Sequence, residues 1–367
     1  MQIIKATRDA ILKPLQTVAG IVEKRTTLPI LANVLIQKDA DMVSFTGTDV
    51  EMQIRTRAAI GAGSDSAGTT VSARKLIDIL RALPETEVTL TQNANRLVVA
   101  AGKSRFTLQT LPAADFPARA AATDVGSSAT ISQRDLRHLL QMVHFAMAQQ
   151  DIRFYLNGLL LVISPQAIRS VATDGHRLAY CALDGGDATA AAEVIVPRKT
   201  VAELMRLLSD TDDSVELQVM NQQLRIAFGD IELVTKLVEG KFPDYQRVIP
   251  TGYTKAIAMN REQFAQSLAR ASILTNEKFK GVRLALSESM LRIQSSNAEQ
   301  EEAVEELDVD YEGESLEIGF NVQYLIDVLA NLKTDLVKVE FGGTDSSALI
   351  SLPGDEGFKY VIMPMRI

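Results

Sequence analysis

The feature that most constrains this chain is an internal repeat. Segments that begin at Val71 and at Val194 align along their length when the Arg-Lys pairs at 74–75 and 198–199 are superposed. Both segments have a helical pattern of apolar residues followed by alternating strand patterns. A weaker third copy begins at Ile318 with "IGFNVQYLIDVLANL". Copies of about 120 residues therefore cover the whole chain, which predicts three similar domains.

The first half of each copy also has a common order. The segments 10–37, 135–163 and 263–288 each contain an amphipathic helix, a short polar linker and an apolar strand. A complete copy therefore combines strands and two helices in the order strand, helix, strands, helix, strands. This order is typical of an α+β fold in which two helices pack on largely antiparallel sheets.

The repeat also predicts where domains begin and end. We predict domains over residues 1–121, 129–249 and 250–367, with linkers at 118–129 and 248–255. Each copy is expected to close with a strand. The first two closing strands are expected to end in Phe116-Pro117 and Phe242-Pro243, and the third to contain Pro364.

Composition limits the class of protein. A hydrophobic content of 46% is enough for folded cores, and the formal net charge of −8 argues by itself against a nucleic-acid-binding surface. Cys181 is the only cysteine, so an intrachain disulfide and a cysteine-based zinc site are both excluded. The N-terminus lacks the apolar core of a signal peptide, and no apolar run is long enough to span a bilayer. We expect a cytoplasmic protein.

The charge is unevenly distributed. Basic residues outnumber acidic ones on the six expected helices, whereas the segment 297–317, "NAEQEEAVEELDVDYEGESLE", is strongly acidic. Equivalent helices of a repeat protein can gather on one side and pool their charge. Such a surface would attract a phosphate backbone weakly and without sequence specificity. The simpler interpretation, solvated helix faces, stays open at this point.

The turn "VATDGHRLAY" (171–180) contains the residue types of an active site. Asp174 and His176 flank Gly175, and Arg177 follows. A carboxylate can orient a histidine as a general base, but no nucleophile or second metal ligand is spaced to join them. The matching turn in the first copy keeps Asp49 but has no histidine. The remaining interpretations are a satisfied structural turn or one rim of a binding groove.

Several motifs resemble one known family from end to end. The chain is similar to the bacterial DNA polymerase III beta subunits, the beta sliding clamps. The motifs are "TLPILANVL" (27–35), "TGTDVEM" (46–52), "TLPAADFP" (110–117), "RFYLNG" (153–158), "VATDGHRLA" (171–179), "VIVPRK" (194–199), "KFPDYQRVIP" (241–250), "ILTNEKFKGVRL" (273–284), "AEQEEAVEELDV" (298–309) and "YVIMPMRI" (360–367). The departures are few, and Phe154 stands where tyrosine is common.

The resemblance implies a function without catalysis, metal or cofactor. Two chains would form a head-to-tail homodimer, a ring of six clamp domains around double-stranded DNA. The ring would tether a replicative polymerase subunit and would also meet the clamp loader and other clamp-binding-motif proteins. A repeat-built interaction scaffold that does not bind DNA is the alternative.

The resemblance also assigns site residues. A cleft for partner peptides would be formed by Leu156, Thr173, Gly175, His176, Arg177, Leu178, Pro243, Arg247, Val248, Asn321, Tyr324, Ser347, Val361, Met363, Pro364, Met365 and Arg366. DNA would be contacted by Arg25, Gln149, Gln150, Phe154, Tyr155, Arg198 and Lys199. The dimer interface would contain Lys103, Arg105, Phe106, Leu108, Ile273, Leu274, Glu299, Glu301 and Glu302.

Overall fold

The structure is a computed structural model that describes residues 1–23, 27–119, 124–185 and 187–366. Within these ranges each copy contains a strand, a helix, four strands, a second helix and three strands. The order is the one that the repeat predicts. All strand pairs between the described strands are antiparallel, so the predicted α+β class is confirmed.

The elements of the three copies have closely similar lengths. The first copy contains β1 (Gln2–Thr7), α1 (Arg8–Ala19), β2 (Asn33–Asp39), β3 (Met42–Thr48), β4 (Met52–Ala58), β5 (Ala67–Ser72), α2 (Ala73–Ala82), β6 (Glu87–Asn93), β7 (Arg96–Ala101) and β8 (Ser104–Leu111). The second contains β9 (Val125–Ser132), α3 (Gln133–Gln141), β10 (Gly158–Ile163), β11 (Ala167–Thr173), β12 (Arg177–Asp184), β13 (Ala192–Pro197), α4 (Arg198–Leu207), β14 (Ser214–Met220), β15 (Gln223–Phe228) and β16 (Ile231–Lys236). The third contains β17 (Lys255–Asn260), α5 (Arg261–Ser272), β18 (Gly281–Ser287), β19 (Met290–Ser296), β20 (Glu302–Asp308), β21 (Leu316–Asn321), α6 (Val322–Asn331), β22 (Leu336–Phe341), β23 (Ala348–Leu352) and β24 (Asp355–Ile362).

Local sequence explains where the helices begin. The side chain of Ser72 accepts a hydrogen bond from the backbone N–H of Lys75 at the start of α2, and Asn260 caps α5 in the same way. Such caps satisfy backbone donors that have no partner inside the helix. In α1, Ile11, Leu15 and Val18 recur at helical spacing and are buried. Burial of each side chain contributes about 1.5–3 kcal/mol.

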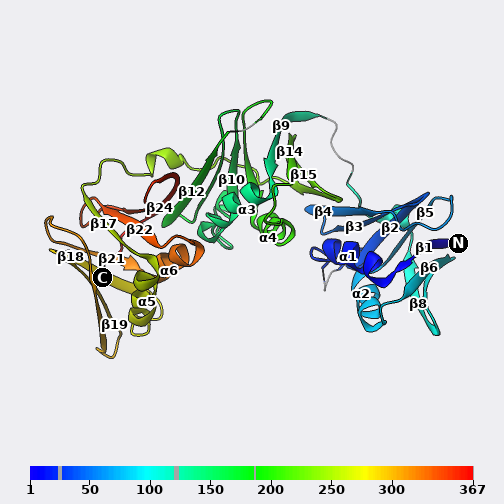
Figure 1. Ribbon diagram of the computed structural model, residues 1–367, viewed down its shortest axis with the longest axis horizontal. Helices are drawn as coiled ribbons and strands as arrows, with labels where there is room; N and C mark the ends of the chain where they lie inside the picture. Colours follow the sequence, from blue (N-terminus) through cyan, green and yellow to red (C-terminus); the bar gives the residue numbers. More distant parts are fainter. Residues whose placement is uncertain (24–26, 120–123, 186, 367) are drawn as a thin grey trace. The chain divides into compact units, whose positions relative to one another are not determined.

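The described chain forms two compact units. Unit 1 contains residues 1–134, 188–190 and 202–237, and unit 2 contains residues 135–187, 191–201 and 238–367. In unit 1 a single sheet runs in the order β1-β6-β7-β8-β5-β2-β3-β4-β16-β15-β14-β9, and α1 and α2 pack against it and against each other (Figure 1). In unit 2 one sheet runs in the order β13-β10-β11-β12-β24-β23-β22-β17, and a smaller one in the order β20-β19-β18-β21. Helices α5 and α6 pack side by side in this unit.

Successive copies are joined by one type of strand pairing. The fourth strand of the first copy, β4, pairs with the last strand of the second copy, β16. Likewise β12 of the second copy pairs with β24, the last strand of the third copy. The corresponding strand of the third copy, β20, pairs only with β19 among the described strands. The last strand of the first copy, β8, pairs with β7 over residues 104–109 and has no second partner there in the described chain.

Three expectations about the ends of the copies are corrected. Phe116-Pro117 and Phe242-Pro243 do not end strands: they lie in the loops after β8 and β16, where Phe116 and Phe242 are buried. Proline has no N–H for a sheet ladder, which suits these loop positions. For the same reason Pro364 lies beyond the end of β24 at Ile362. The predicted linker 118–129 is too long, because β9 begins at Val125.

None of the described helices is long and apolar enough to cross a membrane.

Candidate functional site

The turn between β11 and β12 is held by its own polar side chains. The hydroxyl of Thr173 donates to the backbone carbonyl of Arg177 at 2.6 Å and accepts from the N–H of Gly175 at 3.1 Å. The carboxylate of Asp174 accepts from the backbone N–H groups of His176 at 2.9 Å and Arg177 at 3.1 Å. Asp174 therefore binds the backbone N–H of His176 and not its imidazole.

The first copy has the same turn between β3 and β4. Thr48 donates to the carbonyl of Met52 at 2.9 Å and accepts from the N–H of Val50 at 3.1 Å. Asp49 accepts from the backbone N–H groups of Glu51 and Met52. Because two copies share these bonds, the Thr-Asp pair is an element of the fold. The turn itself therefore accounts for the hydrogen bonds of Asp174.

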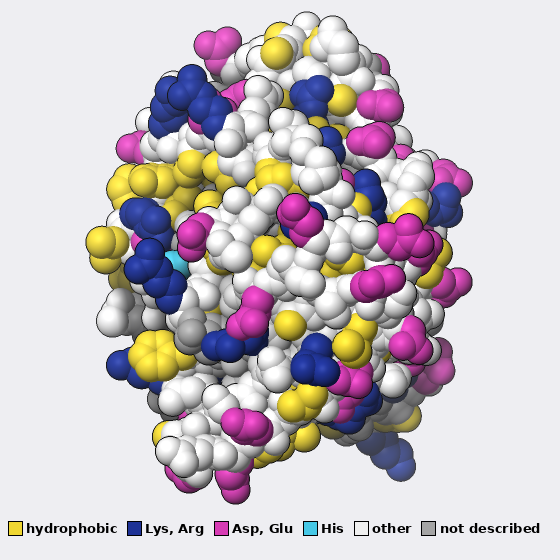
Figure 2. Space-filling view, turned by 90° about the vertical axis from the view of Figure 1, so that its left-hand side faces the viewer, with side chains coloured by type: hydrophobic (Ala, Val, Ile, Leu, Met, Phe, Trp, Pro, Cys, Tyr) yellow, Lys and Arg dark blue, Asp and Glu magenta, His cyan; other side chains and the backbone are white. Residues whose placement is uncertain are grey.

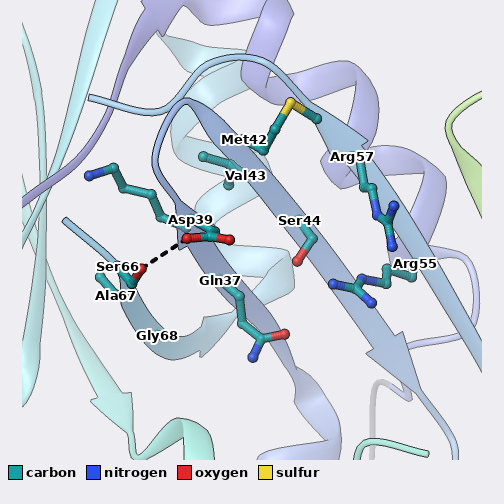
Figure 3. A pocket seen from close by; sticks show the side chains of 11 residues that line it. Gln37, Asp39, Met42, Val43, Ser44, Arg55, Arg57, Ser66, Ala67 and Gly68 are labelled. Atoms are coloured by element: carbon teal, nitrogen blue, oxygen red, sulfur yellow. Dashed lines mark hydrogen bonds between the residues drawn. The ribbon is translucent and has the colours of Figure 1, made fainter. Parts of the chain in front are cut away.

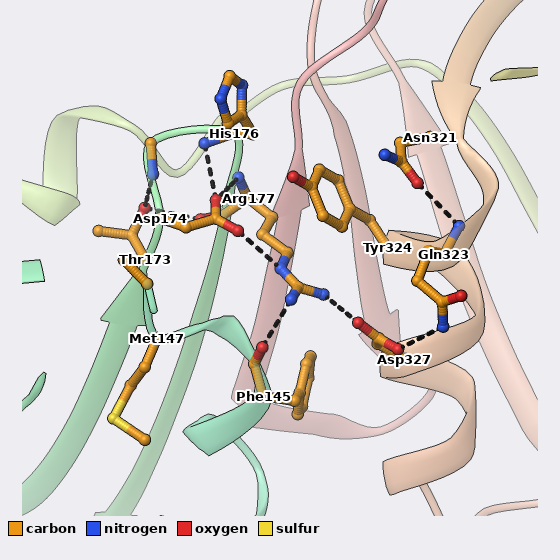
Figure 4. Close-up of polar contacts among 12 residues, drawn as sticks. Phe145, Met147, Thr173, Asp174, His176, Arg177, Asn321, Gln323, Tyr324 and Asp327 are labelled. Carbon is orange, nitrogen blue, oxygen red and sulfur yellow. Dashed lines mark hydrogen bonds and ion pairs between the residues drawn. The ribbon is translucent and has the colours of Figure 1, made fainter. Parts of the chain in front are cut away.

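What distinguishes the second copy is Arg177, whose side chain is almost buried. Its Nε donates to Asp174 at 3.1 Å, Nη1 to Asp327 on α6 at 2.6 Å, and Nη2 to the carbonyl of Phe145 at 2.7 Å. Its guanidinium also lies over the ring of Tyr324, 4.4 Å from the ring centre. Figure 4 shows Arg177 extending from the turn toward α6. The first copy has Met52 at this position, so the network belongs to one copy only.

The charge of Arg177 is matched by its surroundings. Burial by itself lowers the pKa of Arg177, but Tyr360, Asp327 and Asp174 more than offset this effect, so its pKa is raised. Burial also raises the pKa of Tyr360, which is fully buried and donates a hydrogen bond to the carbonyl of Tyr324 at 2.9 Å. The guanidinium therefore stays protonated and fixes the turn against α6.

The exposed His176 and the half-buried Tyr324 form an edge above this network. Their rings stack at 6.5 Å with an interplanar angle of 23°, and both are drawn in Figure 4. The carbonyl of His176 accepts from the N–H of Met363, just after β24. The turn, the start of α6 and the segment after β24 therefore meet in unit 2.

An apolar cluster lies beside this edge. Leu178 and Val361, which face each other across β12 and β24, are buried in a cluster with Phe242 and Tyr245. Val248 is partly buried against the same cluster. On the face shown in Figure 2, hydrophobic side chains gather in a patch that Lys and Arg side chains border, next to a histidine. An apolar floor with a polar rim is the usual composition of a binding groove.

The last described residues line a cavity of about 570 Å³. Pro364, Met365 and Arg366 line it together with residues that include Gly319 on β21 and Asp345. The N–H of Met365 donates to the carbonyl of Gly319 at 2.9 Å, which holds the chain end in place. Met363, by contrast, is 42% exposed. The two methionines of this segment thus differ in their environment.

The remaining predicted cleft residues have varied environments. Leu156 and Thr173 are buried, and Pro243 is half-buried. Arg247 is exposed and pairs with Asp244 at 3.0 Å. Ser347 and Tyr253 share a hydrogen bond of 3.1 Å between their hydroxyls, and Asn321 caps α6. The buried members can only support a groove, and the exposed members can contact a ligand directly.

The predicted DNA residues lie mainly in the segment before β10. Gln149, Gln150 and Phe154 are exposed, and the rings of Phe154 and Tyr155 contact each other edge to face at 5.9 Å. The guanidinium of Arg198 donates to the carbonyl of Met147 at 3.0 Å, so it is partly engaged within the fold. Lys199 is exposed and has an interaction within the chain. Arg25 lies outside the described residues.

The predicted dimer residues lie on the two strand edges described above or beside them. Arg105, Phe106 and Leu108 are on β8, which is exposed on both faces over most of its length, and Lys103 is in the turn before it. Glu302 begins β20, and Glu299 and Glu301 are in the exposed turn before that strand. Ile273 is 75% exposed at the end of α5, and Leu274 is half-buried.

Three residues of the network around Arg177 were not predicted from the sequence: Phe145, Asp327 and Tyr360. Asp327 could have been found from its spacing to Tyr324. It lies one turn after Tyr324 on the same face of the helix, so an arginine packed over the Tyr324 ring would be close to its carboxylate. No group of metal-ligating side chains occurs in the described ranges. Cys181 is buried on β12, and burial raises the pKa of its thiol to about 12.

The fold and site define a class of protein: three copies of one α+β repeat, joined by shared sheets, with a groove beside the chain end. Comparisons with known proteins give the family. Three models of the DNA polymerase III beta subunit family match the chain. The model of the N-terminal domain matches residues 1–120, that of the central domain residues 130–244 and that of the C-terminal domain residues 246–366.

Individual proteins agree over the whole chain. The beta sliding clamp of Pseudomonas putida strain KT2440 is 46% identical over 363 residues, and that of Escherichia coli K12 is 45% identical over 363 residues, each covering 98% of both chains. The crystal structure of the DNA polymerase III subunit beta from Pseudomonas aeruginosa has a TM-score of 0.96 at 45% identity, and the pol III beta of Caulobacter crescentus has 0.93 at 37%. Both cover 100% of both chains. The chain belongs to the family of bacterial DNA polymerase III beta subunits, the beta sliding clamps, and is a processivity factor of DNA replication, not an enzyme.

Proposed function

We propose that two copies of this chain close head to tail into a ring around duplex DNA. The observation that carries the proposal is the pairing of successive copies, β4 with β16 and β12 with β24. In both pairs the fourth strand of one copy pairs with the last strand of the next copy. If the pattern continues, β20 of one chain pairs with β8 of a second chain, the last strand of its first copy. Two such contacts use different surfaces on each chain, as a heterologous interface does, and they close the assembly at two chains.

The same pattern fixes a register for this contact. In the pairing of β4 with β16, Met52 lies opposite Thr235 and Arg55 opposite Glu232. Glu302 takes the position of Gln53, because it pairs with Ser296 as Gln53 pairs with Thr48. Leu108 takes the position of Thr235, because it pairs with Leu97 as Thr235 pairs with Leu224. The partner strands would then be antiparallel, with Val304 opposite Arg105 and Glu306 opposite Lys103.

Charge and exposed apolar area support this interface. Val304 is 52% exposed and Phe106 36% exposed, although both lie on strands. Lys103 and Arg105 at one edge complement the acidic residues at the other, which would fix the partner's orientation. Ile273 and Leu274 would add apolar contacts from the end of α5. The acidic side consists of Glu299, Glu301 and Glu302.

Oligomeric state tests the interface. We expect wild-type protein to sediment at about twice the 40.0 kDa chain mass. Lys103→Glu should shift it toward monomer, and the double variant Lys103→Glu/Glu306→Lys should restore the dimer, because the charges are exchanged on both edges. Ile273→Ala/Leu274→Ala should also weaken the dimer. A dimer that is unaffected by each of these variants at low concentration would refute the proposed contact.

For the hole of the ring we propose weak, phosphate-directed contact with DNA. Neutral side chains that reach the backbone and a few cations would permit sliding, since such contacts carry no sequence information. The proposed contacts are Arg25, Gln149, Gln150, Phe154, Tyr155, Arg198 and Lys199. Binding of linear duplex should weaken steeply with added salt, because phosphate contacts release counterions. Processivity would then come from encirclement.

For the edge around His176 we propose docking of short, mostly apolar peptides. These peptides would belong to the replicative polymerase subunit, the clamp loader and other clamp-binding-motif proteins. The support is the apolar cluster, the stacked His176 and Tyr324, and the exposed Met363, whose flexible thioether adapts to different side chains. The proposed cleft and its supporting residues are Leu156, Thr173, Gly175, His176, Arg177, Leu178, Pro243, Arg247, Val248, Asn321, Tyr324, Ser347, Val361, Met363, Pro364, Met365 and Arg366. A role on the chromosome places the protein in the cytoplasm, and the proposal needs no cofactor.

A further inference from the structure

A second cavity lies in unit 1, on the sheet formed by β2, β3, β4 and β5. Its volume is about 870 Å³, and it is lined by strand residues that include Gln37, Ser44, Arg55 and Arg57. Figure 3 shows the guanidinium groups of Arg55 and Arg57 side by side on β4, with Ser44 on the neighbouring strand. These strands carry none of the proposed cleft, DNA or dimer residues.

Arg55 has a buried donor without an acceptor. Its Nε is inaccessible to solvent and has no hydrogen-bond partner in the described chain. Glu232 lies opposite Arg55 in the pairing of β4 with β16, but its carboxylate accepts a hydrogen bond of 2.8 Å from Arg225 instead. Buried polar groups in native proteins are nearly always satisfied, so an orphaned donor points to a missing acceptor.

Arg57 is exposed, and it too forms no ion pair with a described residue. The register explains why both guanidiniums face the cavity: Arg57 is opposite Ser44 and Arg55 opposite Thr46, two residues apart on the same face of β4. Two unpaired guanidiniums on one face repel each other unless an anion lies between them.

The other charged groups at the cavity are already engaged. Asp39 accepts a hydrogen bond of 3.0 Å from the hydroxyl of Ser66. The ammonium group of Lys38 donates to the backbone carbonyl of Asp65 at 2.6 Å. Asp39 is thus the one carboxylate among the lining residues, and it would disfavour an anion near Ser66. The favourable position is at the Arg55 and Arg57 side, next to Ser44.

The repeat shows that the fold does not require these arginines. With Met52 aligned on Arg177, the second copy has Tyr180 at the position of Arg55 and Ala182 at that of Arg57. A pair of cations found in one copy, with no partner inside the chain, calls for an explanation outside the fold.

We propose that this cavity binds an oxyanion group, a phosphate or a carboxylate, between Arg55 and Arg57. Guanidinium groups bind such anions through paired N–H donors, and a rotation of the Arg55 side chain toward the anion would also give its Nε, which is buried here, the acceptor that it lacks. The hydroxyl of Ser44 and the amide of Gln37 add neutral donors at the same side. The anion can come from a free phosphate or from an acidic side chain of a protein.

Titration of the full-length dimer with inorganic phosphate tests the proposal. The readout is the arginine Nε–Hε resonances in a TROSY spectrum, assigned with Arg55→Met and Arg57→Met. We expect saturable shifts of the Arg55 resonance at constant ionic strength. Arg57→Met should weaken binding about tenfold, because one charged hydrogen-bond donor group is lost. Arg96→Met, which removes an exposed arginine on β7, should bind phosphate as wild type does.

Two peptides then identify the source of the anion. A short glutamate-containing peptide that competes with phosphate, where the matched glutamine peptide does not, indicates a protein carboxylate. Saturation by phosphate without competition from the glutamate peptide indicates a free anion. Either result supports the proposed oxyanion site. The proposal is overturned if wild-type protein shows no saturable shift, or if Arg57→Met binds phosphate as tightly as Arg96→Met. Because Arg57 is exposed, its variant should fold even if Arg55→Met does not.

Discussion

The guanidinium of Arg177, at the start of β12, donates a hydrogen bond of 2.6 Å to Asp327 on α6. The two residues belong to the second and third copies of the repeat, so their ion pair joins two copies within unit 2. Since the Arg177 side chain is 9% exposed and that of Asp327 27% exposed, water compensates little if the pair is broken. The pair holds the His176 turn against the helix that carries Tyr324.

We therefore expect Asp327→Asn to lower the free energy of unfolding by about 2 kcal/mol, because a nearly buried cation loses one of its two carboxylates. Urea unfolding followed by circular dichroism measures the change. Asp310→Asn, which alters an exposed carboxylate in the same copy, is the matched control and should change stability by less than about 0.5 kcal/mol. Equal effects of the two substitutions would contradict a stabilising role of the pair.

The Thr-Asp turns of the first two copies differ in backbone strain. Gly175 has a φ of +91°, and Val50 has a φ of +75° at the same position. The left-handed region costs a β-branched residue more than glycine or asparagine. Val50→Asn should therefore raise the free energy of unfolding by about 1 kcal/mol, and Gly175→Val should lower it by about 2 kcal/mol. Thermal unfolding of both variants checks the signs, and destabilisation by Val50→Asn would refute the strain at this turn.

Burial raises the pKa of the Cys181 thiol to about 12. The reactive thiolate is therefore a negligible fraction at pH 8. We expect Ellman's reagent to leave the native protein unlabelled at pH 8 and to titrate one thiol per chain in urea. Rapid labelling of the native protein would contradict the burial of Cys181.

Sequence patterns predicted the repeat well because helix and strand periodicity is local. The caps at Ser72 and Asn260 follow from the same local signals. The ion pair of Arg177 with Asp327 could not be predicted from spacing, because it joins side chains far apart in the chain through packing of α6 against β24, the strand that pairs with β12. The loop positions of Phe116 and Phe242 were missed because a buried aromatic residue beside proline was interpreted as part of a strand. The Nε of Arg55 has no acceptor because the carboxylate of Glu232 accepts from Arg225 instead, and the sequence does not indicate which arginine Glu232 contacts.

The segment after β24 offers a test of the cleft. Deletion of residues 363–367 removes Met363 and Met365 but leaves β24, which ends at Ile362, and both proposed dimer edges intact. We expect loss of binding to a peptide from the replicative polymerase subunit, measured by fluorescence anisotropy, with an unchanged dimer mass. Loss of the dimer would instead give this segment a structural role.

Met363→Asp is a milder variant for the same site. Met363 is partly exposed, so the substitution should not affect folding, but it places a charge where an apolar peptide would dock. Binding should weaken at least about tenfold. Lys359→Asp, which alters a charge on β24, serves as the control and should bind the peptide nearly as wild type does.

Retention on DNA tests the central claim, a closed ring that holds DNA by encirclement. The protein is loaded onto nicked circular duplex by its clamp loader, and the circles are then linearised with a restriction enzyme before gel filtration. We predict that the protein stays with circles at moderate salt and is lost from linear DNA of the same sequence. Equal retention on both forms, or on neither, would contradict the account and favour a scaffold that does not encircle DNA.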